Sequence, residues 1–310
     1  TAQITGNIPR VGRIGLAYFA SPKGKILTEM TVTRLAENDF LLMTGAGAYW
    51  HDRDLLMASL PAGGSITIND VTRNLATLLV TGPKAPAILA DMTGQSMTHD
   101  DFAWLSHRKI DLAGCQANVI RVSFAGEAGF EIHCPMDGVV AVYDAVMAAG
   151  AAHQLRPFGM LALDSMRLEK GYRSWKADLT SDYTMLESGL GRRVNFNKDD
   201  FVGRAALRAE KQADCQREFV TLTLDDPDDG APFGEAVYLS NVSIDGVDAG
   251  LVVSAGYGHR VGASIAMAVV DRQALAKAKD ISVLVLGRKR RATIIEGHVL
   301  YDPENAKMKV

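Results

Sequence analysis

The alternation of apolar and polar residues predicts a β-hairpin near the start of the chain. Strand-like residues lead to the turn Ser21-Pro22-Lys23-Gly24, and after it apolar or small residues occupy every second position of Lys25–Leu35. A strand with one buried face has this period of two. A further strand-like run, Asp39–Thr44, follows and ends at a glycine-rich break. We therefore expect a hairpin followed by a third strand.

Apolar residues at helical spacing then predict helices separated by strands. The helices are expected at Tyr49–Leu60, Lys84–Met92, Gly138–Ala148, Phe158–Lys170 and Phe201–Gln212. The strands are expected at Ser65–Asn69, Leu75–Val80, Asn118–Phe124 and Phe130–Cys134. Because hairpins occur among the helices, this region is predicted to be α+β and not a doubly wound parallel sheet.

From Arg217 the pattern changes to short strands that alternate with glycine- and aspartate-rich turns. Such spacing predicts an antiparallel barrel or sandwich. The strands are expected at Glu218–Leu224, Leu251–Ser254, Ala263–Val270, Ile281–Leu286 and Ala292–Ile295. We place a domain boundary near residue 214, which gives an α+β region over residues 1–214 and a β domain over residues 215–310.

Length and composition fit a globular chain with two or three compact units. The 310 residues are 47% hydrophobic and 22% charged, which is ordinary for a globular protein. The net charge of −3 provides no basic field for nucleic acid or for an anionic membrane surface, and we expect neither as a partner. The basic run Arg288-Lys289-Arg290-Arg291 is expected at a solvated hairpin tip.

Cysteine usage indicates a reducing compartment. Cys115, Cys134 and Cys215 are far apart and form no CxxC pair, so neither a disulfide framework nor a zinc site is predicted. No apolar run reaches transmembrane length, and no signal segment opens the sequence. We expect a soluble, intracellular protein.

Motifs of covalent, nucleotide and metal chemistry are missing from the sequence. It has no GxGxxG, P-loop, HExxH or GxSxG pattern. His51, Asp52 and Asp54 lie within one helical turn and cannot all converge on a metal ion, so no metal is expected. Asp52 remains as a carboxylate at a helix start, where the positive end of the helix stabilises it. Residue chemistry alone favours this structural role over a catalytic one.

The segment Arg121–Pro135, RVSFAGEAGFEIHCP, places two acidic residues around a glycine-rich turn. Alternation along the second strand points Glu131 to the opposite side from Phe130. A carboxylate that faces inward needs a donor from the protein or from a ligand; the alternative is a hairpin with solvated Glu127 and Glu131. The aromatic and cationic segment Arg167–Trp175 could likewise line a pocket for a flat ligand or form a packing seam between domains.

Longer motifs resemble a known family. RLEKGYRSWKADLTSDYTMLESGLG (Arg167–Gly191), followed by FVGRAAL (Phe201–Leu207), resembles the folate-binding half of dimethylglycine and sarcosine dehydrogenases and oxidases. That half is similar to the glycine-cleavage T-protein, an aminomethyltransferase. GEAGFEI resembles the family's GE-x-G-[FW]-E motif, and SAGYGHRVGASIAMAVV and LYDPENA resemble segments of its C-terminal part. The resemblance covers nearly the whole chain.

The resemblance implies an α+β, three-lobed cloverleaf of the aminomethyltransferase type with tetrahydrofolate in a central cavity. Two lobes would lie in residues 1–214, and a C-terminal antiparallel β-barrel in residues 215–310. The role of catalytic acid falls to Asp52, and Glu131 matches the residue that holds the pterin ring. A carboxylate suits this task because it can accept two adjacent pterin N–H groups. The other residues assigned to the folate pocket are Phe124, Arg167, Tyr172 and Tyr257.

Three positions depart from the family pattern. Phe124 replaces a common tyrosine and so lacks its hydroxyl. Leu163 stands where the T-protein has an arginine, as in the dehydrogenase relatives, and Lys176 stands where relatives usually carry glycine. The sequence also lacks the helix and strand that open these families, and the flavin-binding half of the dehydrogenases. It therefore looks like one part of a larger polypeptide.

The expected function is tetrahydrofolate-dependent one-carbon transfer. The methyl-derived carbon of an oxidised N-methyl amine of the dimethylglycine or sarcosine type would be captured as 5,10-methylene-tetrahydrofolate. FAD is expected only in a separate N-terminal dehydrogenase domain or subunit, and the compartment is the cytoplasm, or the mitochondrial matrix in a eukaryote. Two alternatives stay open: a free-standing T-protein-like aminomethyltransferase, methyltransferase or demethylase, and a folate-binding module without chemistry.

Overall fold

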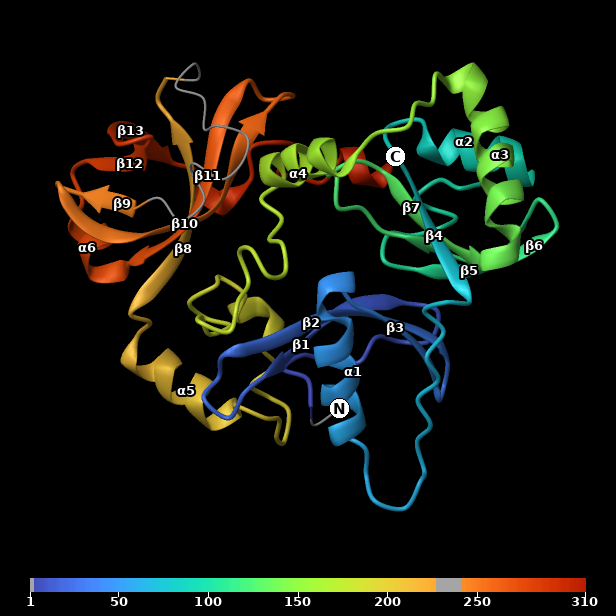
Figure 1. The fold of residues 1–310 in the computed structure, drawn as a ribbon, viewed down its shortest axis with the longest axis horizontal. Helices are drawn as coiled ribbons and strands as arrows, with labels where there is room; N and C mark the ends of the chain where they lie inside the picture. The colour runs from blue at the N-terminus through green and yellow to red at the C-terminus, as the bar shows by residue number, and fades with distance from the viewer. Residues whose placement is uncertain (1–2, 227–240) are drawn as a thin grey trace. The chain divides into compact units, whose positions relative to one another are not determined.

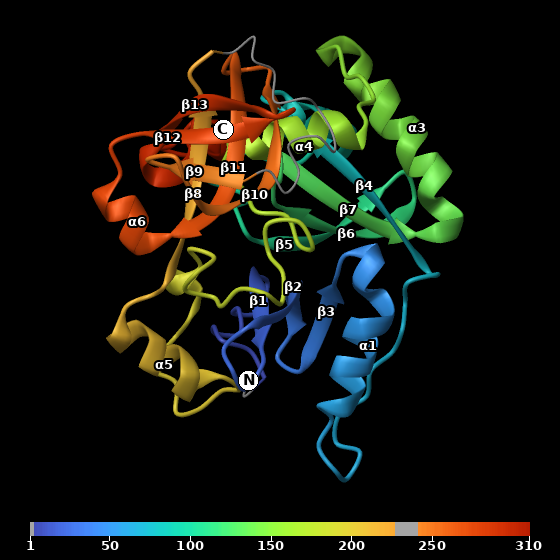
Figure 2. The same ribbon diagram turned by 60° about the vertical axis from the view of Figure 1, so that its left-hand side comes forward.

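The computed structural model describes residues 3–226 and 241–310, which form two compact units (Figures 1 and 2). We call them the barrel unit and the sheet unit. The barrel unit comprises the chain up to Asn7, Ala17–Glu29 and Met160–Pro303, and the sheet unit comprises Ile8–Leu16, Met30–Gly159 and Glu304–Val310. The chain therefore passes between the two units several times.

The predicted hairpin and third strand are confirmed. Strands β1 (Ile14–Ala20), β2 (Ile26–Ala36) and β3 (Asp39–Met43) form a sheet in that order. Along β2 the residues at every second position from Ile26 to Val32 are buried, as the alternation predicts. The turn needs Gly24, because its φ of +77° lies in the left-handed region that other residues rarely adopt.

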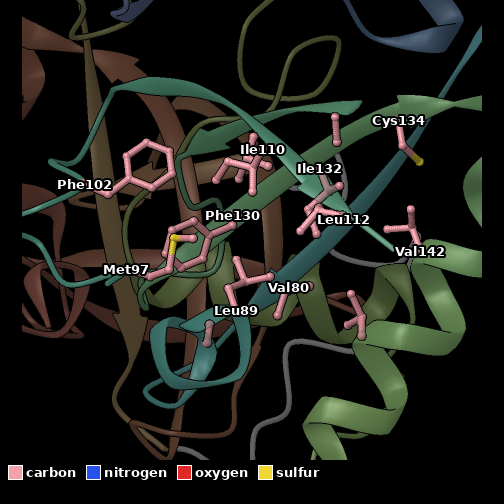
Figure 3. Packing of buried hydrophobic residues seen from close by; sticks show 14 residues of the cluster. Val80, Leu89, Met97, Phe102, Ile110, Leu112, Phe130, Ile132, Cys134 and Val142 are labelled. Atoms are coloured by element: carbon pink, nitrogen blue, oxygen red, sulfur yellow. The ribbon is translucent and has the colours of Figure 1, made fainter. Parts of the chain in front are cut away.

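The sheet unit is built on a four-stranded antiparallel sheet in the order β4-β7-β6-β5. Its apolar face packs against helices α2 and α3, and Figure 3 shows side chains of β7 directed toward Leu89 of α2 and Val142 of α3. The predicted hairpin around the glycine-rich turn is confirmed as β6-β7. The bounds are β4 Leu75–Thr81, β5 His107–Leu112, β6 Cys115–Arg121, β7 Gly129–Pro135, α2 Ala85–Thr93 and α3 Val139–Gly150.

Two features of the sheet unit differ from expectation. Ser65–Asn69 is irregular and not a strand, because no strand among the described residues pairs with it. Strand β5 was not predicted, since its exposed positions are a run of charged residues that hides the buried Ile110 and Leu112. Helix α1 (Tyr49–Ala58) forms where it was expected, preceded by one turn of 3-10 helix.

The predicted antiparallel barrel is confirmed. Six strands close in the order β10-β11-β8-β13-β12-β9 around an apolar interior. The basic run Arg288-Lys289-Arg290-Arg291 lies inside β13 and not at a hairpin tip, because Leu286 and Gly287 make the turn. Residues 227–240, expected within this domain, lie outside the described residues. The bounds are β8 Arg217–Leu224, β9 Asn241–Ile244, β10 Val247–Gly258, β11 Ala263–Asp271, β12 Ile281–Val285 and β13 Arg288–Ile294.

The remaining elements of the barrel unit include α4 (Met160–Glu169) and α5 (Arg204–Ala213), joined by a long irregular segment as predicted, and α6 (Arg272–Lys277). The division predicted near residue 214 stays a prediction; β8 begins at Arg217. Within residues 3–226 and 241–310, every helix is too short or too polar to cross a membrane. The 3-10 turns are η1 Ala46–Ala48, η2 Met136–Gly138, η3 Ala151–His153, η4 Gly191–Arg193, η5 Glu296–His298 and η6 Lys307–Lys309.

Candidate functional site

Asp52, the predicted catalytic acid, is an enclosed carboxylate in the first turn of α1. Its side chain is 1% exposed. One oxygen, Oδ2, accepts a hydrogen bond from Thr44 Oγ1, and the other, Oδ1, lies 2.8 Å from His51 Nδ1. The positive end of the helix adds to this stabilisation. Both carboxylate oxygens therefore have protein partners, which suits a fixed structural anion; its catalytic role stays a prediction.

Glu131, the predicted pterin ligand, lies on the face of β7 opposite Phe130, as alternation requires. Its side chain is 31% exposed, and its Oε2 lies 3.4 Å from Nε2 of the buried His133. On the other side of that imidazole ring, Nδ1 lies 3.0 Å from Thr77 Oγ1. A carboxylate can accept about four hydrogen bonds. One oxygen of Glu131 thus lies within ion-pair distance of His133, and lone pairs of the carboxylate remain for an external donor.

The face of the sheet that carries Glu131 has polar residues on three strands. His107 Nε2 on β5 lies 2.9 Å from Asn118 Oδ1 on β6, and Asn118 pairs in register with His133 on β7. Burial lowers the pKa of His107, so that its neutral form is favoured near pH 7. This face therefore carries hydrogen-bonding groups beside the apolar Ile120 and Leu79, which are the register partners of Glu131.

The second acid of the glycine-rich turn is not solvated as the alternative reading expected. Glu127 is only 9% exposed. The turn folds back on the sheet unit, where the Ala128 carbonyl accepts hydrogen bonds from Gly82 N at 2.8 Å and Thr81 Oγ1 at 3.0 Å. This closure encloses Glu127, whereas Phe124 at the other end of the turn is 36% exposed.

Arg167 is committed to a buried network in the barrel unit. Its guanidinium donates to Asp164 Oδ1 at 2.7 Å, to Asp178 Oδ2 at 2.6 Å and to Ser254 Oγ at 2.8 Å. It also donates to the carbonyl of Tyr172 at 3.2 Å. These contacts join α4 to β10 and to the irregular segment. Arg167 therefore positions neighbouring residues, and its assignment to the folate pocket stays a prediction.

The two tyrosines assigned to the pocket also belong to the barrel unit. Burial, with a smaller contribution from the Asp302 carboxylate, raises the pKa of Tyr172 to about 12. Its hydroxyl is therefore protonated at neutral pH. Tyr257 on β10 accepts a hydrogen bond at its carbonyl from Ser165 Oγ of α4 at 2.6 Å, and its ring meets His259 edge to face.

A further acid, Glu29, lies in the barrel unit and was not among the predicted site residues. Burial raises the pKa of Glu29 on β2, while the Tyr18 hydroxyl and the Arg193 guanidinium oppose that shift. Tyr18 is itself buried, and burial together with the Glu29 charge raises its pKa. The available signal was an acid inside an otherwise alternating strand, but alternation assigns it to the polar face and cannot tell that this face is partly covered.

Comparisons with known proteins agree with the barrel. The profile of the GCVT N-terminal domain matches residues 3–198, and that of the glycine cleavage T-protein C-terminal barrel domain matches residues 217–302. The chain belongs to the glycine cleavage T-protein family. Members of this family are folate-dependent aminomethyltransferases.

Relatives within the T-protein family include larger enzymes. Human mitochondrial dimethylglycine dehydrogenase is 32% identical over 305 residues, which cover 97% of this chain and 35% of that protein. Human mitochondrial sarcosine dehydrogenase is 33% identical over 219 residues, which cover 66% of this chain and 24% of that protein. This chain thus spans about a third of the length of the dimethylglycine dehydrogenases that it matches.

Free-standing enzymes of the T-protein family also match. The aminomethyltransferase of Caldanaerobacter subterraneus is 27% identical over 281 residues, which cover 90% of this chain and 72% of that protein. The crystal structure of aminomethyltransferase T from Bartonella henselae superposes with a TM-score of 0.79 at 23% identity, covering 96% of this chain and 80% of that one. The predicted aminomethyltransferase-type fold is therefore confirmed.

The Glu131 carboxylate of this T-protein relative fits the pterin ring of a folate. It is partly exposed and has lone pairs for N–H donors of that ring. Phe124 offers an apolar surface at the turn but no hydroxyl.

Proposed function

We propose that this chain catalyses tetrahydrofolate-dependent one-carbon transfer, capturing the methyl-derived carbon of an oxidised N-methyl amine as 5,10-methylene-tetrahydrofolate. The observation that carries the proposal is the partly exposed Glu131 carboxylate, on the sheet face opposite the core residue Phe130 and within the motif GEAGFEI. The 32% identity to human dimethylglycine dehydrogenase, in an alignment that covers 97% of this chain, supports an amine of the dimethylglycine or sarcosine type.

Glu131 would bind the pterin ring through paired N–H···O hydrogen bonds. Hydrogen bonds to an ionised acceptor are roughly twice as strong as neutral ones, and two parallel bonds also fix orientation. His133, 3.4 Å from one oxygen and braced by Thr77, would hold the carboxylate in place. Tetrahydrofolate supplies the amine nitrogens that accept the carbon, and holding them at attack distance is itself a large catalytic contribution.

We propose Asp52 as the group that accepts the proton leaving the attacking amine, the role that the family resemblance implies. Asp52 belongs to the sheet unit, as Glu131 does. Its carboxylate is 1% exposed, and Thr44 and His51 contact its two oxygens.

Oxidation of the amine would take place elsewhere. We propose that a flavin-containing domain or subunit delivers the oxidised amine, and that FAD belongs there and not to this chain. The match to free-standing aminomethyltransferases over 72% of one of them supports the second candidate, an aminomethyltransferase that acts without a flavin partner. Product formation from an aminomethyl donor in the absence of any flavoprotein would favour that candidate.

The test combines tetrahydrofolate titration with capture of formaldehyde carbon above the spontaneous rate. Glu131→Gln should weaken tetrahydrofolate binding about tenfold or more, because a charge-assisted bond is lost. Asp52→Asn should lower turnover by about 10² or more with binding unchanged, as expected for loss of a general base. Turnover that Asp52→Asn leaves unchanged would exclude Asp52 from that role. No binding of tetrahydrofolate to the unmodified chain would refute the proposed function.

A further inference from the structure

The segment Glu304–Val310 is separated in sequence from the sheet unit but belongs to it. We call it the C-terminal segment. Met308 is 1% exposed, and the Lys307 carbonyl accepts a hydrogen bond from Ala128 N at 3.0 Å. Ala128 ends the glycine-rich turn, three positions before Glu131. The C-terminal segment is therefore bonded directly to the turn that leads into the proposed pterin ligand.

Arg121, at the end of β6, binds the same segment from the other side of the turn. Its side chain is fully buried. Nη1 donates to the carbonyls of Met97 at 2.6 Å and Phe102 at 3.1 Å. Nη2 donates to the carbonyl of Met308 at 3.5 Å and to the main-chain oxygen of Val310. Two of the four acceptors therefore come from the C-terminal segment.

The environment of Arg121 makes it dependent on that segment. Among the described residues, no carboxylate side chain forms an ion pair with it, so carbonyl dipoles carry the whole compensation for its buried charge. The face of the Phe130 ring, 5.3 Å from the guanidinium carbon, adds a cation–π contact. A buried charged donor that loses its acceptors is costly. Displacing the C-terminal segment would leave Nη2 without acceptors.

The contacts of Arg121 and Ala128 with the C-terminal segment are connected to Glu131 through the backbone of the β6-β7 hairpin. Arg121 and Phe130 are register partners in the β6-β7 hairpin, and Glu131 follows Phe130 directly. The peptide between Ala128 and Gly129 is held at its carbonyl by Thr81 and Gly82. The N–H of Ala128 has Lys307 as its acceptor. The turn is thus fixed on one side by β4 and on the other by the C-terminal segment.

We propose that the C-terminal segment, bound by Arg121 and by Ala128, positions the β6-β7 hairpin so that Glu131 can bind the pterin ring. Arg121 and Met308 are then positioning residues for tetrahydrofolate binding, although neither touches the ligand. The predicted effect on tetrahydrofolate binding rests on the proposed function. The dependence of the glycine-rich turn on the C-terminal segment can be measured without folate.

The test compares the full chain with Arg121→Met, Met308→Ala and the double variant. Hydrogen exchange, without ligand, should show the Ala128 amide exchanging about tenfold faster or more in each variant, because a fluctuating segment exposes it. Tetrahydrofolate should bind about tenfold more weakly, the loss expected when one well-placed contact is disturbed. The double variant should be little worse than either single one, since both changes release the same segment. Arg121→Lys, which keeps the charge and can reach some of the carbonyls, should recover part of the affinity.

Val142→Ala is the matched control. Val142 lies on α3 in the same core and is fully buried, so this change destabilises the sheet unit without touching the turn or the C-terminal segment. It should leave both Ala128 exchange and tetrahydrofolate affinity unchanged. Equal effects of Val142→Ala and Arg121→Met would reduce Arg121 to a general stability role and overturn the proposal, as would unchanged Ala128 exchange in Met308→Ala. If the unmodified chain binds no tetrahydrofolate while Ala128 exchange still depends on Arg121, the proposed function fails and the positioning of the turn stands.

Discussion

At the scale of single residues, the raised pKa of Glu29 makes the stability of the fold depend on pH. Because burial raises the pKa of Glu29, the folded chain retains a proton that the unfolded chain releases above about pH 4.5. Stability at this site is therefore highest below pH 4.5 and declines as pH rises through the folded-state pKa. Glu29→Gln never ionises, so it should raise the melting temperature at pH 8 more than at pH 5.

Thermal melts of both proteins from pH 5 to pH 8 check this. Asp54→Asn, which changes an exposed acid on α1, serves as the control and should give a difference that does not grow with pH. A Glu29→Gln gain that is constant across the range would show that ionisation of Glu29 is not the cause.

Backbone conformation at Lys176 predicts a stabilising substitution. Its φ is +70°, in the left-handed region that residues other than glycine rarely adopt. A side chain there costs about 1–2 kcal/mol, whereas glycine loses roughly 0.5–1 kcal/mol of conformational freedom. Lys176→Gly should therefore raise the free energy of unfolding by up to about 1 kcal/mol in denaturant titrations. Lys176→Ala retains the strain and should show no such gain; a similar gain in both variants would trace it to loss of the lysine side chain.

The acids of the candidate site show where local sequence stops being informative. Alternation was enough to place Glu131 opposite Phe130. It could not show that Glu127 is enclosed, or that Glu29 is partly covered, because the covering residues come from distant segments of the chain. The resemblance supplied candidate roles for Asp52 and Arg167, but not the hydrogen bonds that already occupy both side chains.

At the scale of elements, the buried ion pair of α4 couples that helix to the rest of the barrel unit. Arg167 and Asp178 are both almost fully buried and lie 2.6 Å apart. Arg167→Met leaves the Asp178 charge uncompensated and should destabilise the protein by about 3–5 kcal/mol, the usual cost of breaking one partner of a buried pair. Denaturant titration gives the value.

The companion variant separates charge from packing. Arg167→Met combined with Asp178→Asn removes both charges while Ser174 N, 2.8 Å from Asp178 Oδ2, keeps an acceptor. It should recover more than half of the lost stability. A double variant as unstable as Arg167→Met alone would mean that the other donors of Arg167, and not the ion pair, hold α4.

Elements were predictable where their signal is complete within a few residues. The period of two along β2 and the helical spacing of α3 and α4 were sufficient to locate them. Ser65–Asn69 has the same alternation but no strand beside it, and β5 has a partner in β6 but a charged exposed face. Strand formation depends on the neighbour as much as on the segment itself.

At the scale of the whole molecule, the domain boundary read from the sequence differs from the division into two compact units. Composition changes near residue 214, where the strands of the barrel begin. Compactness instead groups Ala17–Glu29 with Met160–Pro303, so residues near the start of the chain complete the unit that contains the barrel. Local patterns predict the barrel and the hairpins, but they do not contain the long-range contacts that assign each segment to a unit.

The position of Glu304–Val310 in the sheet unit has a consequence for the order of synthesis. A chain emerging from a ribosome completes β4 to β7 long before residue 310 is made, since translation adds roughly 5–20 residues per second. Until then the guanidinium of Arg121 lacks two of its four carbonyl partners. Until residues 304–310 are added, the nascent sheet unit lacks the contacts that this segment makes with Arg121 and Ala128. A premature stop codon or a frameshift near the 3′ end of this region would therefore damage a hairpin encoded some 500 nucleotides upstream.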